Sequence, residues 1–122
     1  MATPENLARW RNDFRQVQET IEKDREEFDA WFEETAMLEA EIKVATEEIR
    51  QTVTDIKNDR QRYCELLKQI PNVDDFTDEE VEKRNGKASA LLDIAGKIAI
   101  MKVHVPRKME KLRFLLTHEI KR

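Results

Sequence analysis

A seven-residue repeat of apolar side chains dominates the first half of the chain. From Leu7 to Ile70, every seventh residue is apolar or aromatic, with Thr35 as the one exception. A repeat of this length is typical of an α-helix that supercoils around a neighbour, because seven residues make almost two helical turns. No Gly or Pro interrupts residues 5–70. The sequence therefore predicts one long helix over residues 4–70.

The amino-acid composition also favours long helices. Charged residues make up 39% of the chain and hydrophobic residues another 39%, with only two Gly and three Pro among 122 residues. This balance is typical of coiled-coil and helical proteins rather than of β-sheets. We therefore expect an all-α fold, organised as a single elongated helical domain over residues 1–122.

A second helix is predicted after a short break that is rich in turn residues. The segment 71–77, PNVDDFT, starts with a proline and contains three further turn formers. At its end, Thr77 and Glu80 have the spacing of a capping box. The sequence therefore predicts a turn over 71–77 and a helix over 78–121.

Two features weaken this second predicted helix. The Asn-Gly pair at 85–86 favours a break in the first turns, and Pro106 favours a kink or a second break. The β-branched stretch 97–106 also fits a strand, but no second strand candidate exists with which it could pair. We therefore expect a helix that is weakened near 85–86 and kinked or broken near 106.

The seven-residue connection favours an antiparallel helical hairpin, that is, a two-helix coiled coil. With the turn centred near Asp74, residues 26–46 would face residues 102–122. The first window holds seven acids and one base, whereas the second holds seven bases and two acids. Such complementary charges select the orientation and register of the helices more than they stabilise them. The predicted intramolecular pairs are Glu41 with Lys108 and Glu39 with Arg113.

This hairpin would leave two apolar surfaces without a partner inside the chain. The start of the long helix would extend beyond the short one, and the second helix is apolar on nearly all sides. We therefore expect the hairpin to pack into a four-helix-type bundle with a second copy, most simply as a dimer, or with a helical hetero-partner. The predicted partner-binding residues are Leu7, Trp10, Phe14, Val17, Ile21, Leu92, Ile94, Met101, Phe114, Leu115 and Ile120.

No motif in the sequence indicates catalysis, a metal or a cofactor. The two Gly do not form a phosphate-binding loop. His104 and His118 have no second ligand at zinc-site spacing, and Cys64 is most simply a helix-surface cysteine. We therefore expect a protein that is not an enzyme and that has no catalytic, metal or cofactor residues and no small-molecule substrate.

Net charge and the absence of targeting signals restrict the expected binding partners and the expected cellular location of the protein. The net charge of −4 gives no bulk attraction to nucleic acid or to an anionic membrane. The N-terminus lacks the basic and apolar regions of a secretory signal, and a single cysteine is compatible with a reducing compartment. We therefore expect a cytoplasmic or nuclear protein.

Three functions remain open on the sequence alone. The leading hypothesis is a structural or adaptor protein that oligomerises and joins parts of a larger complex. The alternatives are a membrane- or nucleic-acid-binding module that uses the basic amphipathic segment 102–122, and a holdase-like chaperone with exposed apolar helical arms. Salt dependence separates the first two, because electrostatic binding weakens with ionic strength and apolar binding does not.

Overall fold

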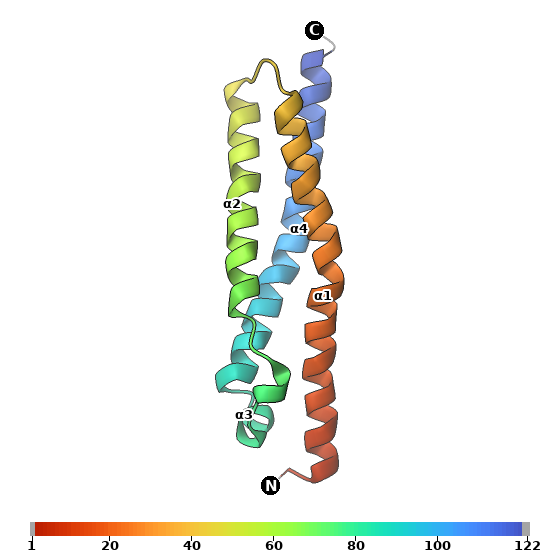
Figure 1. The fold of residues 1–122 in the computed structure, drawn as a ribbon, viewed down its shortest axis with the longest axis vertical. Coiled ribbons are helices and arrows are strands. Elements are labelled where there is room, and N and C mark those ends of the chain that lie inside the picture. Colours follow the sequence, from red (N-terminus) through yellow and green to blue (C-terminus); the bar gives the residue numbers. More distant parts are fainter. Residues whose placement is uncertain (1, 121–122) are drawn as a thin grey trace.

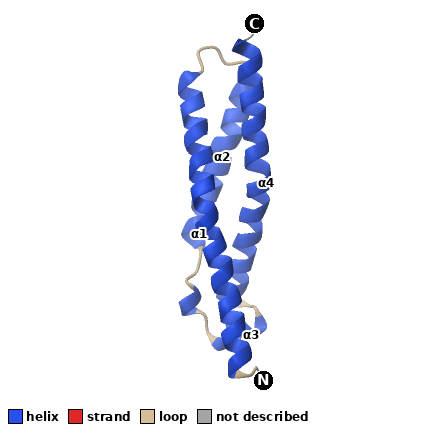
Figure 2. Cartoon of the chain, turned by 90° about the vertical axis from the view of Figure 1, so that its right-hand side faces the viewer, coloured by secondary structure: helices blue, strands red, loops and turns tan. Residues whose placement is uncertain are grey.

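The computed structural model describes residues 2–120, and the side chains among them through residue 118. Over this range the chain folds into helices without a β-strand, which confirms the all-α class (Figures 1 and 2). Residues 2–120 form four α-helices and one short 3-10 helix. The elements are α1 (Pro4–Glu41), α2 (Glu47–Gln69), η1 (Val73–Asp75), α3 (Asp78–Lys83) and α4 (Gly86–Ile120).

The three long helices lie side by side, and α1 and α4 run in the same direction, whereas α2 runs in the opposite one (Figure 1). Two ion pairs define the alignment of α1 with α4. The Nζ atom of Lys102 lies 2.7 Å from a carboxylate oxygen of Asp24, and Arg113 binds Glu34 through two hydrogen bonds. These pairs are 78 and 79 positions apart in the sequence. Residue x of α1 therefore lies beside residue x + 78 of α4.

The predicted continuous helix over 4–70 is wrong, because α1 ends at Glu41 and the chain reverses over residues 42–46. The restart at α2 is capped by Thr46, whose hydroxyl accepts a hydrogen bond from the backbone N–H of Ile49 at 3.3 Å. This reversal buries the apolar stripe of α2 against the rest of the same chain. The buried apolar residues of α2 are Ile49, Val53, Ile56, Tyr63 and Leu66.

Near the N-terminal end of α1, the core is completed by η1 and α3. Both pack against α1, below α2 in the view of Figure 1. The rings of Phe14 and Phe76 meet edge to face with centroids 5.5 Å apart. Arg11 binds Asp78 at 2.5 Å on the surface beside this contact. The lower part of α1 is therefore covered from within the chain, and η1 lies inside the predicted turn 71–77.

The joint between α3 and α4 contains the break that was predicted near 85–86. The capping box of Thr77 and Glu80 is present, as predicted, and α3 ends at Lys83, followed by Arg84 as its C-cap in the left-handed conformation. The carboxylate of Glu80 also accepts a hydrogen bond from the backbone N–H of Lys87 at 2.6 Å, which connects the two helices and lowers the pKa of Glu80. Gly86 has φ +53°, and a Cβ there would collide with Glu80, so both conformation and space favour glycine.

Pro106 does not break α4, which is continuous from Gly86 to Ile120. A proline inside a helix removes one backbone hydrogen bond and costs about 3 kcal/mol in isolation. Burial of the neighbouring apolar residues offsets this, because Val105, Met109 and Leu112 are at most 1% exposed. The stretch 97–106 is helical throughout.

An aromatic cluster joins α1 to α2 at the centre of the bundle. Phe28 is fully buried, and its ring stacks on Tyr63 with centroids 4.2 Å apart and planes inclined by 17°. Trp31 and Phe32 complete the cluster, with ring centroids 5.0 and 6.2 Å from that of Phe28. The hydroxyl of Tyr63 is buried and has no hydrogen-bond partner in the structure.

Burial raises the pKa of Tyr63 to about 12, from its ordinary value of 10.0. Because the unfolded chain ionises first, folding stability should fall as pH rises from about 10 to about 12. We expect this residue to account for a loss of about 1–2 kcal/mol over that range, allowing for partial solvent screening. Urea titrations at several pH values should show a smaller alkaline loss in Tyr63→Phe, which keeps the ring. Equal losses in both proteins would contradict the burial of this hydroxyl.

Candidate functional site

The predicted partner-binding residues do not form one exposed surface. The prediction assumed that the start of the first helix has no partner inside the chain, and this is wrong because α3, η1 and α4 cover it. Four of the residues are buried in the core: Phe14, Ile21, Ile94 and Met101. Four more are partly buried beside it: Leu7, Trp10, Val17 and Leu115. Leu92 and Phe114 are exposed, at 38% and 61%, and the side chain of Ile120 lies outside the described residues.

The predicted pairs of Glu41 with Lys108 and of Glu39 with Arg113 are also wrong, because α1 and α4 are parallel. The acidic part of α1 does face the basic part of α4, but through different residues. Arg113 binds Glu34, and Lys102 binds Asp24. The remaining partners come from α2: Lys108 binds Asp59 at 2.7 Å, Glu39 binds Lys57 at 2.5 Å, and Lys111 lies 3.7 Å from Glu48.

A groove follows the line along which α1 and α4 meet. It contains three hollows of about 120, 300 and 730 Å³, lined by α1, α4 and the loops next to them. We call this surface the α1–α4 groove. Trp10, Asp13 and Leu92 help to line the lower hollow, Thr20, Ala99 and Val103 the middle one, and Val17 both.

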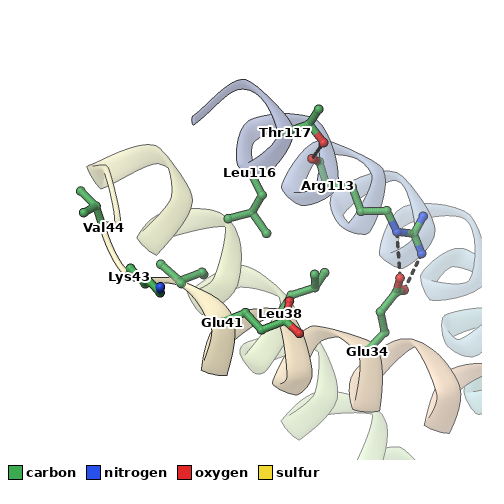
Figure 3. Close-up of a pocket in the computed structure, with 9 residues that line it drawn as sticks. Glu34, Leu38, Glu41, Lys43, Val44, Arg113, Leu116 and Thr117 are labelled. Atoms are coloured by element: carbon green, nitrogen blue, oxygen red, sulfur yellow. Dashed lines mark hydrogen bonds and ion pairs between the residues drawn. The ribbon is translucent and has the colours of Figure 1, made fainter. Parts of the chain in front are cut away.

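The upper hollow lies between the end of α1, the loop 42–46 and the last turns of α4 (Figure 3). Its lining combines the apolar side chains of Leu38, Ile42 and Leu116 with a charged rim. In Figure 3 the Glu34–Arg113 pair closes one side of the hollow. The hydrogen bond to Glu34 raises the pKa of Arg113, whose charge therefore remains at this rim.

The α4 wall of the groove carries an exposed face without charge. Its residues follow one another at helical spacing: Ser89, Leu92, Gly96, Ala99, Ile100 and Val103. We call these six residues the α4 apolar face. Leu92, Ile100 and Val103 are 38%, 59% and 50% exposed. A Cβ added at Gly96 would meet nothing within 4 Å, so the surface is open there.

The opposite edge of the groove is polar and exposed. Six residues of α1 point outward along it at helical spacing: Arg9, Asp13, Gln16, Thr20, Lys23 and Glu27. We call these the α1 polar stripe. Beside the stripe, in the middle hollow, Asp24 and Lys102 join the two helices. Their hydrogen bond raises the pKa of Lys102. The groove thus has an apolar wall, a partly apolar floor and a rim of alternating charge, which is the usual make-up of a protein-binding surface.

Sequence reasoning missed part of this groove. Gly96 and Ala99 were not predicted as partner-binding residues, although their spacing from Leu92 is helical. The α1 polar stripe was not predicted either, because exposed charges on a helix normally have no partner. The outward direction of both sets depends on the parallel pairing of α1 with α4, which the heptad repeat alone does not specify.

The described part of the chain offers little for other chemistry. Among its residues, no group of three or more His, Cys, Asp or Glu side chains lies close enough together to hold a metal ion. None of the helices in that part has an apolar stretch long enough to cross a membrane. Comparisons with protein-family models, with curated proteins and with solved structures found no match to this chain.

Proposed function

We propose that this chain is a non-enzymatic assembly protein that binds helices of other protein molecules through the α1–α4 groove. The observation that supports this most is the α4 apolar face, which runs over six exposed residues without a charge. Contiguous exposed apolar surface next to a polar rim is typical of interaction sites.

The direction of the helices favours a helical partner. In helical bundles with short connections, neighbouring helices usually run antiparallel, which also places opposite ends of their dipoles together. Here α1 and α4 are parallel neighbours (Figure 1). A further helix in the groove, antiparallel to both, would complete a bundle in which up and down helices alternate around a shared core.

The charges of α4 count against the membrane- or nucleic-acid-binding alternative. Four basic side chains of the segment 102–122 are paired with carboxylates of α1 or α2: Lys102, Lys108, Lys111 and Arg113. Binding of an external polyanion would have to compete with these pairs. We therefore favour a protein partner held by apolar contacts.

The substitution Val103→Glu tests the proposal. It should weaken partner binding about 30-fold or more, because it removes an apolar contact and places a charge in the interface. The free energy of unfolding should change by less than about 0.5 kcal/mol, because Val103 is exposed in the isolated chain. Met37→Glu is the matched control, since Met37 is 61% exposed and is not among the residues that line the three hollows.

The measurement is capture of proteins from an extract of cells that express the chain, compared at low and high salt. Proteins retained by the wild type and by Met37→Glu, but lost with Val103→Glu, would support the proposal, provided that their retention resists high salt. Retention that Val103→Glu does not change, or that high salt removes together with bound nucleic acid, would contradict it.

A further inference from the structure

We infer that the α1–α4 groove pairs with the same groove of a second copy, the two copies running antiparallel about a twofold axis that passes close to Gly96. The inference rests on the proposed function of the groove and adds the identity and the register of one partner. A twofold axis perpendicular to the helices makes every helix antiparallel to its copy. It therefore supplies the orientation that the groove favours, with α1 over α1 and α4 over α4.

The α1 polar stripe is complementary to itself in this orientation. Its six exposed residues are, in order, Arg9, Asp13, Gln16, Thr20, Lys23 and Glu27. When two such stripes run antiparallel about their midpoint, Arg9 meets Glu27, Asp13 meets Lys23, and Gln16 meets Thr20. Every charged residue then meets an opposite charge of the second copy, and symmetry makes each contact twice. A parallel pairing would instead place each charge against its own copy.

The residue of the α4 apolar face that has no side chain, Gly96, lies level with the midpoint of the α1 polar stripe along the bundle axis. The midpoint of the stripe is residue 18, and the offset of 78 between α1 and α4 places residue 96 beside it. Gly96 has no side chain, and the space that a Cβ would occupy there is empty. Two α4 helices can therefore approach closely at the axis, while the larger apolar residues of the face lie on either side of it.

The hollows of the groove fit this register. With the axis at residue 96 to 97, Leu92 of the second copy comes to the height of about residue 101, beside the middle hollow lined by Ala99 and Val103. Val103 of the second copy comes to the height of about residue 90, beside the lower hollow lined by Trp10 and Leu92. Exposed apolar side chains of each copy thus lie opposite hollows of the other.

The test uses charge reversal within the α1 polar stripe of the full 122-residue chain, with mass measured by analytical ultracentrifugation. The wild type should sediment at twice the 14.5 kDa of one chain. Asp13→Lys places Lys against Lys, and Lys23→Asp places Asp against Asp, so each variant alone should dimerise about tenfold more weakly. An equal mixture of the two variants restores both attractions and should dimerise like the wild type.

Glu26→Lys is the matched control, because Glu26 is exposed outside the stripe and the substitution makes the same change of charge as Asp13→Lys. It should leave the dimer unchanged. Rescue on mixing cannot come from a folding defect, since each variant would carry its own defect into the mixture.

Three results would overturn the inference: a wild type that stays monomeric up to about 0.1 mM, single variants that still dimerise as the wild type does, and a mixture that does not recover. The proposed function can be tested separately from the pairing of two copies. If the wild type is monomeric but Val103→Glu still abolishes capture of another protein, self-pairing fails and the assembly function stands. If Val103→Glu changes neither dimerisation nor capture, both fail.

Discussion

Phe28→Ala should lower the free energy of unfolding by about 3–5 kcal/mol, the range typical of a large aromatic residue removed from a packed core. Phe28 is fully buried and contacts three other aromatic rings. Its closest ring belongs to Tyr63 of α2, so the substitution leaves a cavity where two helices meet. Chemical denaturation followed by circular dichroism measures the loss.

Phe114→Ala is the matched control for this prediction. It removes the same ring from a position that is 61% exposed, and it should cost less than about 1 kcal/mol. The pair of Phe28 and Tyr63 gives a sharper test through a double-mutant cycle. In one continuous helix the two residues would lie about 50 Å apart and could not couple. Additive losses in Phe28→Ala, Tyr63→Ala and the double variant would contradict the reversal at 42–46.

The second large effect should come from the ion pair between α2 and α4. Asp59 is 5% exposed, and one of its carboxylate oxygens lies 2.7 Å from the Nζ atom of half-buried Lys108. Among the described residues, Lys108→Ala would leave this buried carboxylate with Arg62 as its one remaining ion-pair partner, at 3.7 Å. We expect a loss of about 2–3 kcal/mol, because a buried charge without its partner is strongly unfavourable.

Two comparisons make the ion-pair prediction specific. Lys97→Ala removes an exposed lysine that pairs with Asp93 on the same helix, and it should cost less than about 0.5 kcal/mol. Adding Asp59→Ala to Lys108→Ala should recover part of the loss, since the unpaired charge is then gone. A Lys108→Ala variant as stable as Lys97→Ala, measured by the same urea titration, would show that the pair does not hold α2 to α4.

The local features of the fold were largely predictable from the sequence. The heptad pattern and the scarcity of turn formers predicted an all-α chain, and this is confirmed. The capping box at Thr77 and Glu80 formed as predicted, because its hydrogen bonds involve only residues close in sequence. The break near Gly86 was predictable for the same reason.

The reversal at residues 42–46 was not predictable from local signals. The segment IKVAT contains no Gly or Pro, and each of its residues is acceptable in a helix. The apolar repeat even continues across it in phase, from Ile42 to Ile49. The chain reverses because α2 gains burial against α1 and α4, and this gain depends on residues that are distant in sequence. Pro106 shows the opposite case, in which burial keeps a helix intact across a residue that favours a break.

The candidate site was predictable only in part, for the same reason. Complementary charge indicated correctly that the acidic stretch of α1 faces the basic stretch of α4, but it did not determine whether the helices are parallel or antiparallel. That direction decides which residues point outward. Because α1 and α4 are parallel, four residues that were predicted to bind a partner are buried in the core instead: Phe14, Ile21, Ile94 and Met101. The α4 apolar face remains exposed.

We propose that the reversal of the chain at residues 42–46 exposes a groove that pairs with a second copy. Zero-length carbodiimide cross-linking, read by mass spectrometry of the separated monomer and dimer bands, tests it most directly. We expect Asp24–Lys102 and Asp59–Lys108 links in both bands. We expect an Asp13–Lys23 link in the dimer band alone, since these two residues are about 15 Å apart along one helix. A Glu41–Lys108 link in place of Asp59–Lys108, or a dimer band without the Asp13–Lys23 link, would contradict it.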